Sequence, residues 1–291
     1  MMPQLTMARL LFAALAALTL PAAALAQEPP CPSFEVTGSG PDLVLVPGLG
    51  SSPAVWDGVR ENLAKDYRLH LVHVAGFAGR APAGDPATLV ERTSAEIIRH
   101  LDCQKVDRTA YAGHSMGGFL GLMLAADHPE RISKVVVVDS LPFFPLIFDP
   151  AATVEGAALQ ADAMRAALLA LDDASFAAGQ RMGVQSLVTG ADHQTQVADW
   201  TITSDRASFA SAFHALMTTD LRPRLALIAV PVTVLAAANA FAPRSRVEPL
   251  YAAAYAGLPQ AKLTVIEDSY HFIMFDQPAA FEAALRAGLA D

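Results

Sequence analysis

Cysteine, basic side chains and long apolar runs are all scarce in this chain of 291 residues. The two cysteines form no CxxC motif and the carboxylates form no run, so the sequence predicts neither a zinc site nor a calcium loop. Lys and Arg number 20 against 29 Asp and Glu, for a formal net charge of −9. This acidity argues against nucleic-acid binding. Beyond the N-terminus, no uninterrupted apolar segment is long enough to span a membrane.

The first 26 residues have the pattern of a signal peptide. Arg9 precedes an apolar run over 10–20, and the small residues of Ala24-Leu25-Ala26 supply a cleavage pattern. The run is short for a bilayer span, although an uncleaved N-terminal anchor is the alternative. Cleavage after Ala26 predicts a periplasmic or secreted protein, with no stable membrane span, whose mature part is residues 27–291.

An exported chain permits a disulfide between its two cysteines. Cys31 lies in the N-terminal arm, and Cys103 follows a helix predicted over 87–101. The bond would close a loop of about 72 residues, for which chain entropy predicts roughly 4 kcal/mol of stabilisation. Two separate thiols are the alternative, because sequence does not show whether the Cα atoms come within bonding distance.

The most informative segment is residues 111–118, Tyr-Ala-Gly-His-Ser-Met-Gly-Gly. It contains a GxSxG motif centred on Ser115, between a strand predicted over 108–112 and a helix predicted over 118–128. On such a strand-to-helix turn the serine hydroxyl stands clear of the sheet, and the two glycines leave room for the turn. The motif therefore predicts that Ser115 is a nucleophile.

A serine hydroxyl is a weak nucleophile, so it needs a base and hydrogen-bond donors for the developing oxyanion. A buried strand predicted over 42–46 leads into Pro-Gly-Leu-Gly-Ser-Ser at 47–52. This loop could bring the main-chain N–H of Leu49 to the serine, although an ordinary strand-ending turn is the alternative. The N–H of Met116, directly after the nucleophile, is the other predicted donor.

His271 is the predicted base among eight histidines. It alone lies on a loop after a late strand, between a strand predicted over 262–266 and a helix from about 278 to 289. His114 would point away from the site if Ser115 points into it. The remaining histidines lie beside an early strand, at helix ends or in the middle of the chain: His70, His73, His100, His128, His193 and His214.

Four segments, VPGLGSS, GHSMGGFLG, VVVVDSLPF and SYHFIMFDQP, follow one another in an order that resembles the α/β-hydrolase superfamily. The resemblance runs from about Phe34 to the C-terminus. It implies a mostly parallel, eight-stranded α/β sheet with helices on both faces, a helical lid after the sixth strand, and hydrolysis through an acyl-enzyme. It leaves the substrate open, because this scaffold hosts esterases, lipases, lactonases, acyltransferases and C–C hydrolases. Dehalogenases and epoxide hydrolases are disfavoured, since those relatives use an aspartate in place of Ser115.

A serine hydrolase of this kind also needs an acid that orients the histidine, and here the sequence departs from the family pattern. The acid usually follows the seventh strand, here 231–235, and Asn239 occupies that position. Asp139 follows the sixth strand, at the correct edge of the sheet, and some members of the family carry their acid there. Asp139 as the working acid and Asn239 as an uncharged orienting group both remain open. Asp139 could instead only hold the start of the lid.

The segment from about 142 to 222 is predicted as an insertion in a single hydrolase domain, since no linker or repeat indicates a second domain. Helices are predicted near 154–170, 174–185, 192–202 and 207–217. Such helices would close over the catalytic edge as a lid. Several large apolar side chains would line an acyl pocket or form the lid's own core: Phe143, Phe144, Phe148, Met182, Phe213 and Met217.

These features predict an exported serine hydrolase acting on an apolar, uncharged carboxylic ester, thioester or lactone. Ser115 would attack the carbonyl carbon, His271 would transfer the proton, and the N–H groups of Leu49 and Met116 would bind the oxyanion. The prediction includes no cofactor, no metal and no nucleic-acid partner. The rival is a ligand-binding or sensing member of the same fold with weak or lost turnover, supported by Asn239 at the acid position.

Overall fold

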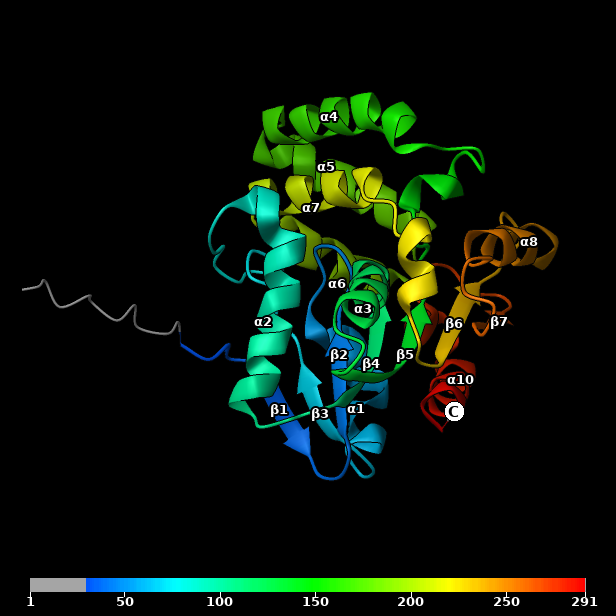
Figure 1. The fold of residues 1–291 in the computed structure, drawn as a ribbon. Coiled ribbons are helices and arrows are strands. Elements are labelled where there is room, and N and C mark those ends of the chain that lie inside the picture. Colours follow the sequence, from blue (N-terminus) through cyan, green and yellow to red (C-terminus); the bar gives the residue numbers. More distant parts are fainter. Residues whose placement is uncertain (1–29, 291) are drawn as a thin grey trace, which may run out of the picture. The chain divides into compact units, whose positions relative to one another are not determined.

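Residues 30–290 are described by a computed structural model (Figure 1). The predicted signal peptide, residues 1–26, lies outside the described residues. Within 30–290, no helix has both the length and the apolar character needed to cross a membrane.

A seven-stranded sheet runs through the described part of the chain. Its strands are β1 (Glu35–Gly38), β2 (Asp42–Val46), β3 (Arg68–Leu71), β4 (Thr109–His114), β5 (Ile132–Val138), β6 (Val232–Ala237) and β7 (Lys262–Ile266). Their spatial order is β1-β3-β2-β4-β5-β6-β7; β1 pairs antiparallel with β3, and all other pairs are parallel. The loops that follow the parallel strands therefore meet at one edge of the sheet, as in other open α/β sheets.

The sheet in residues 30–290 has one strand fewer than the eight expected, so that part of the fold prediction is wrong. Before β1, the chain forms an irregular arm beside α2 (Leu89–Cys103). Cys31 is disulfide-bonded to Cys103, with 6.1 Å between the Cα atoms, and the carbonyl oxygen of Pro32 lies 3.3 Å from Nδ1 of His100. These contacts hold the arm on a helix, where its main chain adds no strand. The predicted disulfide is confirmed.

Alternate residues of the central strands enter two hydrophobic clusters, one on each face of the sheet. Val44 and Val46 belong to the first cluster, whereas Leu43 and Leu45 belong to the second, as the two-residue period of a strand requires. α2 and α3 (Met116–Asp127) supply side chains to the first cluster, and α1 (Asp57–Leu63) and α10 (Pro278–Ala290) supply them to the second (Figure 1). Helices thus cover both faces, as predicted.

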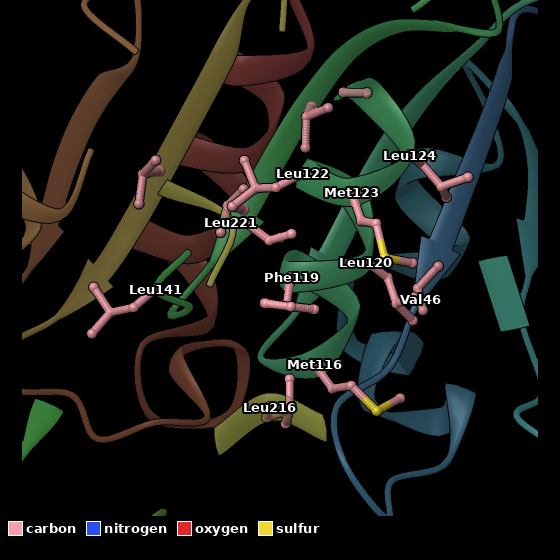
Figure 2. Packing of buried hydrophobic residues seen from close by; sticks show 14 of the residues in the cluster. Val46, Met116, Phe119, Leu120, Leu122, Met123, Leu124, Leu141, Leu216 and Leu221 are labelled. Carbon is pink, nitrogen blue, oxygen red and sulfur yellow. The ribbon is translucent and has the colours of Figure 1, made fainter. Parts of the chain in front are cut away.

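Residues 116–125 of α3 are apolar and all buried, as expected for a helix that is hydrophobic all round. In Figure 2 its side chains lie between Val46 of β2 on one side and Leu141 and Leu221 on the other, and all belong to one cluster. Leu141 directly precedes the insertion, and Leu221 lies near its end. The remaining short elements are η1 (Pro53–Trp56), η2 (Pro86–Thr88), η3 (Phe144–Ile147), η4 (Val184–Ser186), η5 (Arg222–Leu227), α8 (Arg244–Ala254) and α9 (Ile273–Asp276).

Four helices between β5 and β6 form the predicted insertion: α4 (Val154–Ala170), α5 (Asp173–Gly183), α6 (Ala191–Ile202) and α7 (Arg206–Thr218). Their bounds agree with the predicted ranges to within a few residues. Three of them begin at a side chain that accepts a hydrogen bond from a main-chain N–H three residues later, namely Thr153, Asp172 and Asp205. Such caps satisfy N–H groups that a helix start leaves without partners, and they explain why sequence located these helices well.

The insertion contacts loops at the carboxyl edge of the sheet. The hydroxyl of Ser204 lies 3.3 Å from the carbonyl oxygen of Gly50, in the loop after β2. The N–H of Phe272, after β7, donates to the carbonyl of Leu187 at 3.1 Å. α4, α5 and α7 lie together beyond one end of the sheet (Figure 1). That the insertion acts as a lid stays a prediction.

Candidate active site

Ser115 lies on a strained turn between β4 and α3. Its φ of 53° and ψ of −117° fall outside the regions that side-chain-bearing residues prefer, which costs about 1–3 kcal/mol. A Cβ at Gly113 would lie 2.2 Å from the carbonyl carbon of Gly117, and a Cβ at Gly117 would lie 2.4 Å from the carbonyl oxygen of Val46. Both glycines are therefore required, and Ser115 remains partly exposed at the edge of the sheet.

Asp139 lies next to this turn. β4 and β5 pair in parallel with His114 opposite Val138, so Ser115 and Asp139 are the next residue on each strand. The N–H of Ser115 donates to the carbonyl of Val138 at 2.8 Å. Because the strands end together, the sheet itself brings the two side chains to one edge.

His271 approaches the same edge on the loop between β7 and α9. Its Nδ1 lies 2.7 Å from Oδ2 of Asp139, so Nδ1–H donates to the carboxylate and leaves Nε2 to exchange a proton. The side chain of His271 is 26% exposed and that of Asp139 is 14% exposed, so the pair is only weakly screened by solvent. The geometry brings a serine turn, an imidazole and a carboxylate to one edge.

The second oxygen of Asp139 has two donors that sequence reasoning missed. The N–H of Ala237, on β6, donates to Oδ1 at 3.0 Å, and the hydroxyl of Tyr251, on α8, donates to the same atom at 2.9 Å. Every carboxylate oxygen of Asp139 is thus engaged. The sequence offers one signal for these donors, the pair Tyr251 and Tyr255 four residues apart. Their hydrogen-bond partners depend on how α8 packs, so the sequence alone did not identify them.

Asn239 has a different set of contacts. Its Oδ1 accepts hydrogen bonds from the N–H groups of Phe241 and Ala242, at 2.9 and 3.0 Å. Its Nδ2 donates to the carbonyl of Ser269 at 3.1 Å. The amide thereby closes the loop after β6 and joins it to the loop that carries His271. The structure places the imidazole beside Asp139, whereas Asn239 bonds only to main-chain atoms.

The glycine-rich loop after β2 passes directly against the serine. A Cβ at Gly48 would lie 2.9 Å from Nδ1 of His114 and 3.1 Å from Cβ of Ser115. Leu49, the next residue, is half-buried. Met116 opens α3, so its N–H has no carbonyl one turn earlier in the helix to bind. Both positions suit donors aimed at a bound carbonyl, and their role stays a prediction.

His114 contacts His271 from the buried side of the turn, which sequence reasoning did not anticipate. It is fully buried, its Nε2 lies 3.0 Å from the carbonyl oxygen of His271, and the two rings are 4.5 Å apart. Burial, and to a lesser degree positive charge on His271, holds the pKa of His114 well below its usual value of 6.5. A neutral His114 with its proton on Nε2 donates to the main chain of His271.

The apolar residues proposed for a pocket divide into three groups. Phe143 and Met217 are buried in the first cluster, together with side chains of the sheet, α2 and α3. Phe144 and Phe213 are half-buried and meet edge to face, with 5.9 Å between ring centroids. Phe148 and Met182 are 65% and 72% exposed. The Phe144–Phe213 pair is therefore the remaining candidate for an apolar contact with a ligand.

Within residues 30–290, no three or more His, Cys, Asp or Glu side chains lie close enough together to hold a metal ion.

The sequence is similar to proteins of known activity. A pimeloyl-[acyl-carrier protein] methyl ester esterase from Edwardsiella ictaluri is 30% identical over 253 residues, which cover 84% of this chain and 91% of the relative. An enzyme of the same name from Aeromonas hydrophila is 38% identical over 112 residues. That match covers 38% of this chain and 42% of the relative, so it spans less than half of that enzyme's length.

The fold is also similar to a solved structure. The crystal structure of a hydrolase from Pseudomonas aeruginosa has a TM-score of 0.73 at 25% identity, covering 89% of this chain and 94% of that chain. The family model described as alpha/beta hydrolase fold matches residues 41–278, which is most of the sequence. This chain therefore belongs to the α/β hydrolase fold family.

Proposed function

We propose that this chain is an exported serine hydrolase that cleaves carboxylic esters through an acyl-enzyme. One observation carries the proposal: Asp139 holds the imidazole of His271 at 2.7 Å, at the sheet edge where the strained turn presents Ser115. A serine made nucleophilic by an oriented imidazole is the arrangement that acyl transfer requires.

In the first half of the reaction, Oγ of Ser115 forms a bond to the carbonyl carbon while Nε2 of His271 takes the hydroxyl proton. The carbonyl oxygen gains the negative charge, and the N–H groups of Leu49 and Met116 stabilise it. The tetrahedral intermediate then collapses. The bond to the alcohol oxygen breaks, and the alcohol leaves with the proton from His271.

In the second half, water attacks the acyl carbon and gives a proton to Nε2 of His271. The tetrahedral intermediate collapses, the bond to Oγ of Ser115 breaks, and His271 returns the proton to Oγ, which releases the acid and restores the serine hydroxyl. The imidazole is positively charged in both transition states, so a carboxylate beside Nδ1 stabilises both. Asp139 meets this requirement, since the Tyr251 hydroxyl and the Ala237 N–H bind Oδ1 and leave Oδ2 to the imidazole.

The substrate class rests on the relatives and on two apolar side chains of the insertion. Both relatives reported above are named for cleavage of a methyl ester, which favours a carboxylic ester here. The half-buried Phe144 and Phe213 favour an apolar, uncharged acyl or alkyl group over a charged one. Thioesters and lactones present the same electrophilic carbonyl and belong to the proposed range.

Export is part of the proposal. The signal-peptide pattern of residues 1–26 predicts transfer to the periplasm or to the medium. The Cys31–Cys103 bond supports that compartment, because disulfides persist where the surroundings are oxidising. The helical insertion is proposed to act as the lid, since it contacts the loops after β2 and β7.

A sensing protein without turnover was supported only by the uncharged Asn239. Asp139 now supplies the carboxylate beside His271, so no observation favours that alternative.

Hydrolysis of p-nitrophenyl esters with acyl chains of graded length tests the proposal. Wild-type protein should release p-nitrophenol, and Ser115→Ala, which removes only the hydroxyl, should lower turnover by about 10³-fold or more. His271→Ala should cause a similar loss, and the double variant should be little worse, because nucleophile and base act as one unit. Turnover by Ser115→Ala at the wild-type rate would contradict the proposal.

A further inference from the structure

Two tyrosines, one on α8 and one directly after it, bond to the segment that follows β5. Tyr251 and Tyr255 are one helical turn apart, both are buried, and their rings stack with 6.4 Å between centroids. The Tyr251 hydroxyl donates to Oδ1 of Asp139 at 2.9 Å, whereas the Tyr255 hydroxyl donates to the main-chain carbonyl of Ser140 at 2.7 Å. One tyrosine therefore binds the carboxylate, and the other binds the backbone beside it.

The acid needs such support because of where it lies. Asp139 has a φ of 47°, in the left-handed region that residues other than glycine avoid, so it leaves the strand on a tight turn. The last torsion of an aspartate side chain is broad, so one hydrogen bond does not fix the plane of the carboxylate. From this geometry we infer that Tyr251 is a positioning residue that directs Oδ2 of Asp139 toward His271. The inference rests on the proposed serine-hydrolase function.

Two donors from different elements converge on Oδ1. The N–H of Ala237 reaches it from β6 and the hydroxyl of Tyr251 from α8, while His271 binds Oδ2. With Oδ1 held from both sides, rotation of the carboxylate would break two hydrogen bonds. Oδ2 is thereby kept in the plane that the imidazole requires.

A tyrosine suits this position chemically. Burial, followed by the charge of Asp139, raises the pKa of Tyr251 well above its usual value of 10, so the hydroxyl remains a donor. It is also uncharged. An arginine or lysine here would pair with the carboxylate and compete with the imidazolium for its charge. Tyr251 orients the carboxylate and leaves the charge to His271.

Tyr255 provides a matched control. Tyr251→Phe and Tyr255→Phe each remove one oxygen from a buried ring, on α8 and at its C-cap, but only Tyr251 touches the carboxylate. Both variants should lose some stability through the lost hydrogen bond. Only Tyr251→Phe should alter catalysis.

The first experiment measures kcat, KM and the pH dependence of kcat/KM for both variants on one p-nitrophenyl ester. Tyr251→Phe should lower kcat by about 10-fold with KM unchanged, because a loosened carboxylate stabilises the imidazolium less. The acid limb of its pH profile should move to lower pH for the same reason. The groups that face His271 are Asp139 and His114, and neither is altered in these variants. Tyr255→Phe should stay within about twofold of wild type.

The second experiment adds Tyr251→Phe to Asp139→Asn. If Tyr251 acts through the carboxylate, its removal should cost less than about twofold in that background. A double variant whose kcat is tenfold below that of Asp139→Asn alone would overturn the inference. A Tyr251→Phe enzyme whose kcat and acid limb match those of Tyr255→Phe would also overturn it. An acid limb displaced to higher pH would also overturn it, since that shift signals a change in charge and not in orientation.

Ser115→Ala distinguishes a failure of the proposed serine-hydrolase function from a failure of the role assigned to Tyr251. If Ser115→Ala retains activity, the proposed function fails whatever the tyrosine variants do. If it is inactive and the two tyrosine variants are indistinguishable, only the role of Tyr251 fails.

Discussion

Exchanging the two candidate acids, one variant at a time, tests the assignment of Asp139. Asp139→Asn keeps an oxygen that can accept from Ala237 and Tyr251, but it removes the negative charge beside His271. Two unit charges about 4 Å apart interact by roughly 4 kcal/mol at an effective dielectric constant of 20. That energy corresponds to about three decades in rate. Asp139→Asn should therefore lower kcat by about 10³-fold and leave the melting temperature nearly unchanged.

Asn239→Asp places a carboxylate at the position usual for the family. In this protein the new carboxylate would put a charged oxygen where Nδ2 of Asn239 now donates to the carbonyl of Ser269 at 3.1 Å. A lost donor and an unsatisfied buried acceptor cost about 1–3 kcal/mol, so this variant should melt at a lower temperature and gain no activity.

Steady-state kinetics on one ester and thermal melts of both proteins give the answer. A mild loss in Asp139→Asn, together with an Asn239→Asp enzyme activated by orders of magnitude, would refute the reasoning.

Two further predictions concern stability. Replacing Cys31 and Cys103 together by Ala should lower the melting temperature by roughly 10 °C. Opening the loop costs about 4 kcal/mol of stability, and each kcal/mol shifts the melting temperature of a domain of this size by about 2–4 °C. Two thiols titratable in the folded, unreduced protein would contradict the bond. His114 stays neutral in the folded protein, since burial lowers its pKa, so below pH 6.5 the unfolded chain binds a proton that the folded chain does not. Its contribution to the free energy of unfolding should therefore fall by about 1 kcal/mol per pH unit below pH 6.5, as measured by urea unfolding. His114→Gln, which keeps a donor for the carbonyl of His271, should lose stability less steeply. Equal pH slopes in the two proteins would argue against a neutral His114.

Local sequence patterns predicted those parts of the site and fold that local sterics decide. The tight turn at Ser115 needs glycines on both sides, and helix caps such as Thr153 and Asp205 mark where the insertion's helices begin. These features depend on residues within four positions of one another, so a single sequence exposes them.

The acid and its support depend on contacts across the sheet. Asp139 and Asn239 both lie at the carboxyl edge, and sequence could not tell which one meets His271, 132 residues from Asp139. The deciding contacts come from β6 and α8, through Ala237 and Tyr251. The strand count also depends on a long-range contact, since the arm before β1 is joined to α2 by the disulfide between Cys31 and Cys103, 72 residues apart.

Titration with a fluorophosphonate, which forms a covalent bond to an activated serine, tests the central claim most directly. Ester turnover should fall in proportion to the reagent bound and reach zero at one equivalent, and peptide mapping should find the label on Ser115. Ser115→Ala should be neither labelled nor active, because the hydroxyl that reacts is the one that forms the acyl-enzyme. Ester turnover that survives complete labelling, or a label on any other residue, would contradict the account.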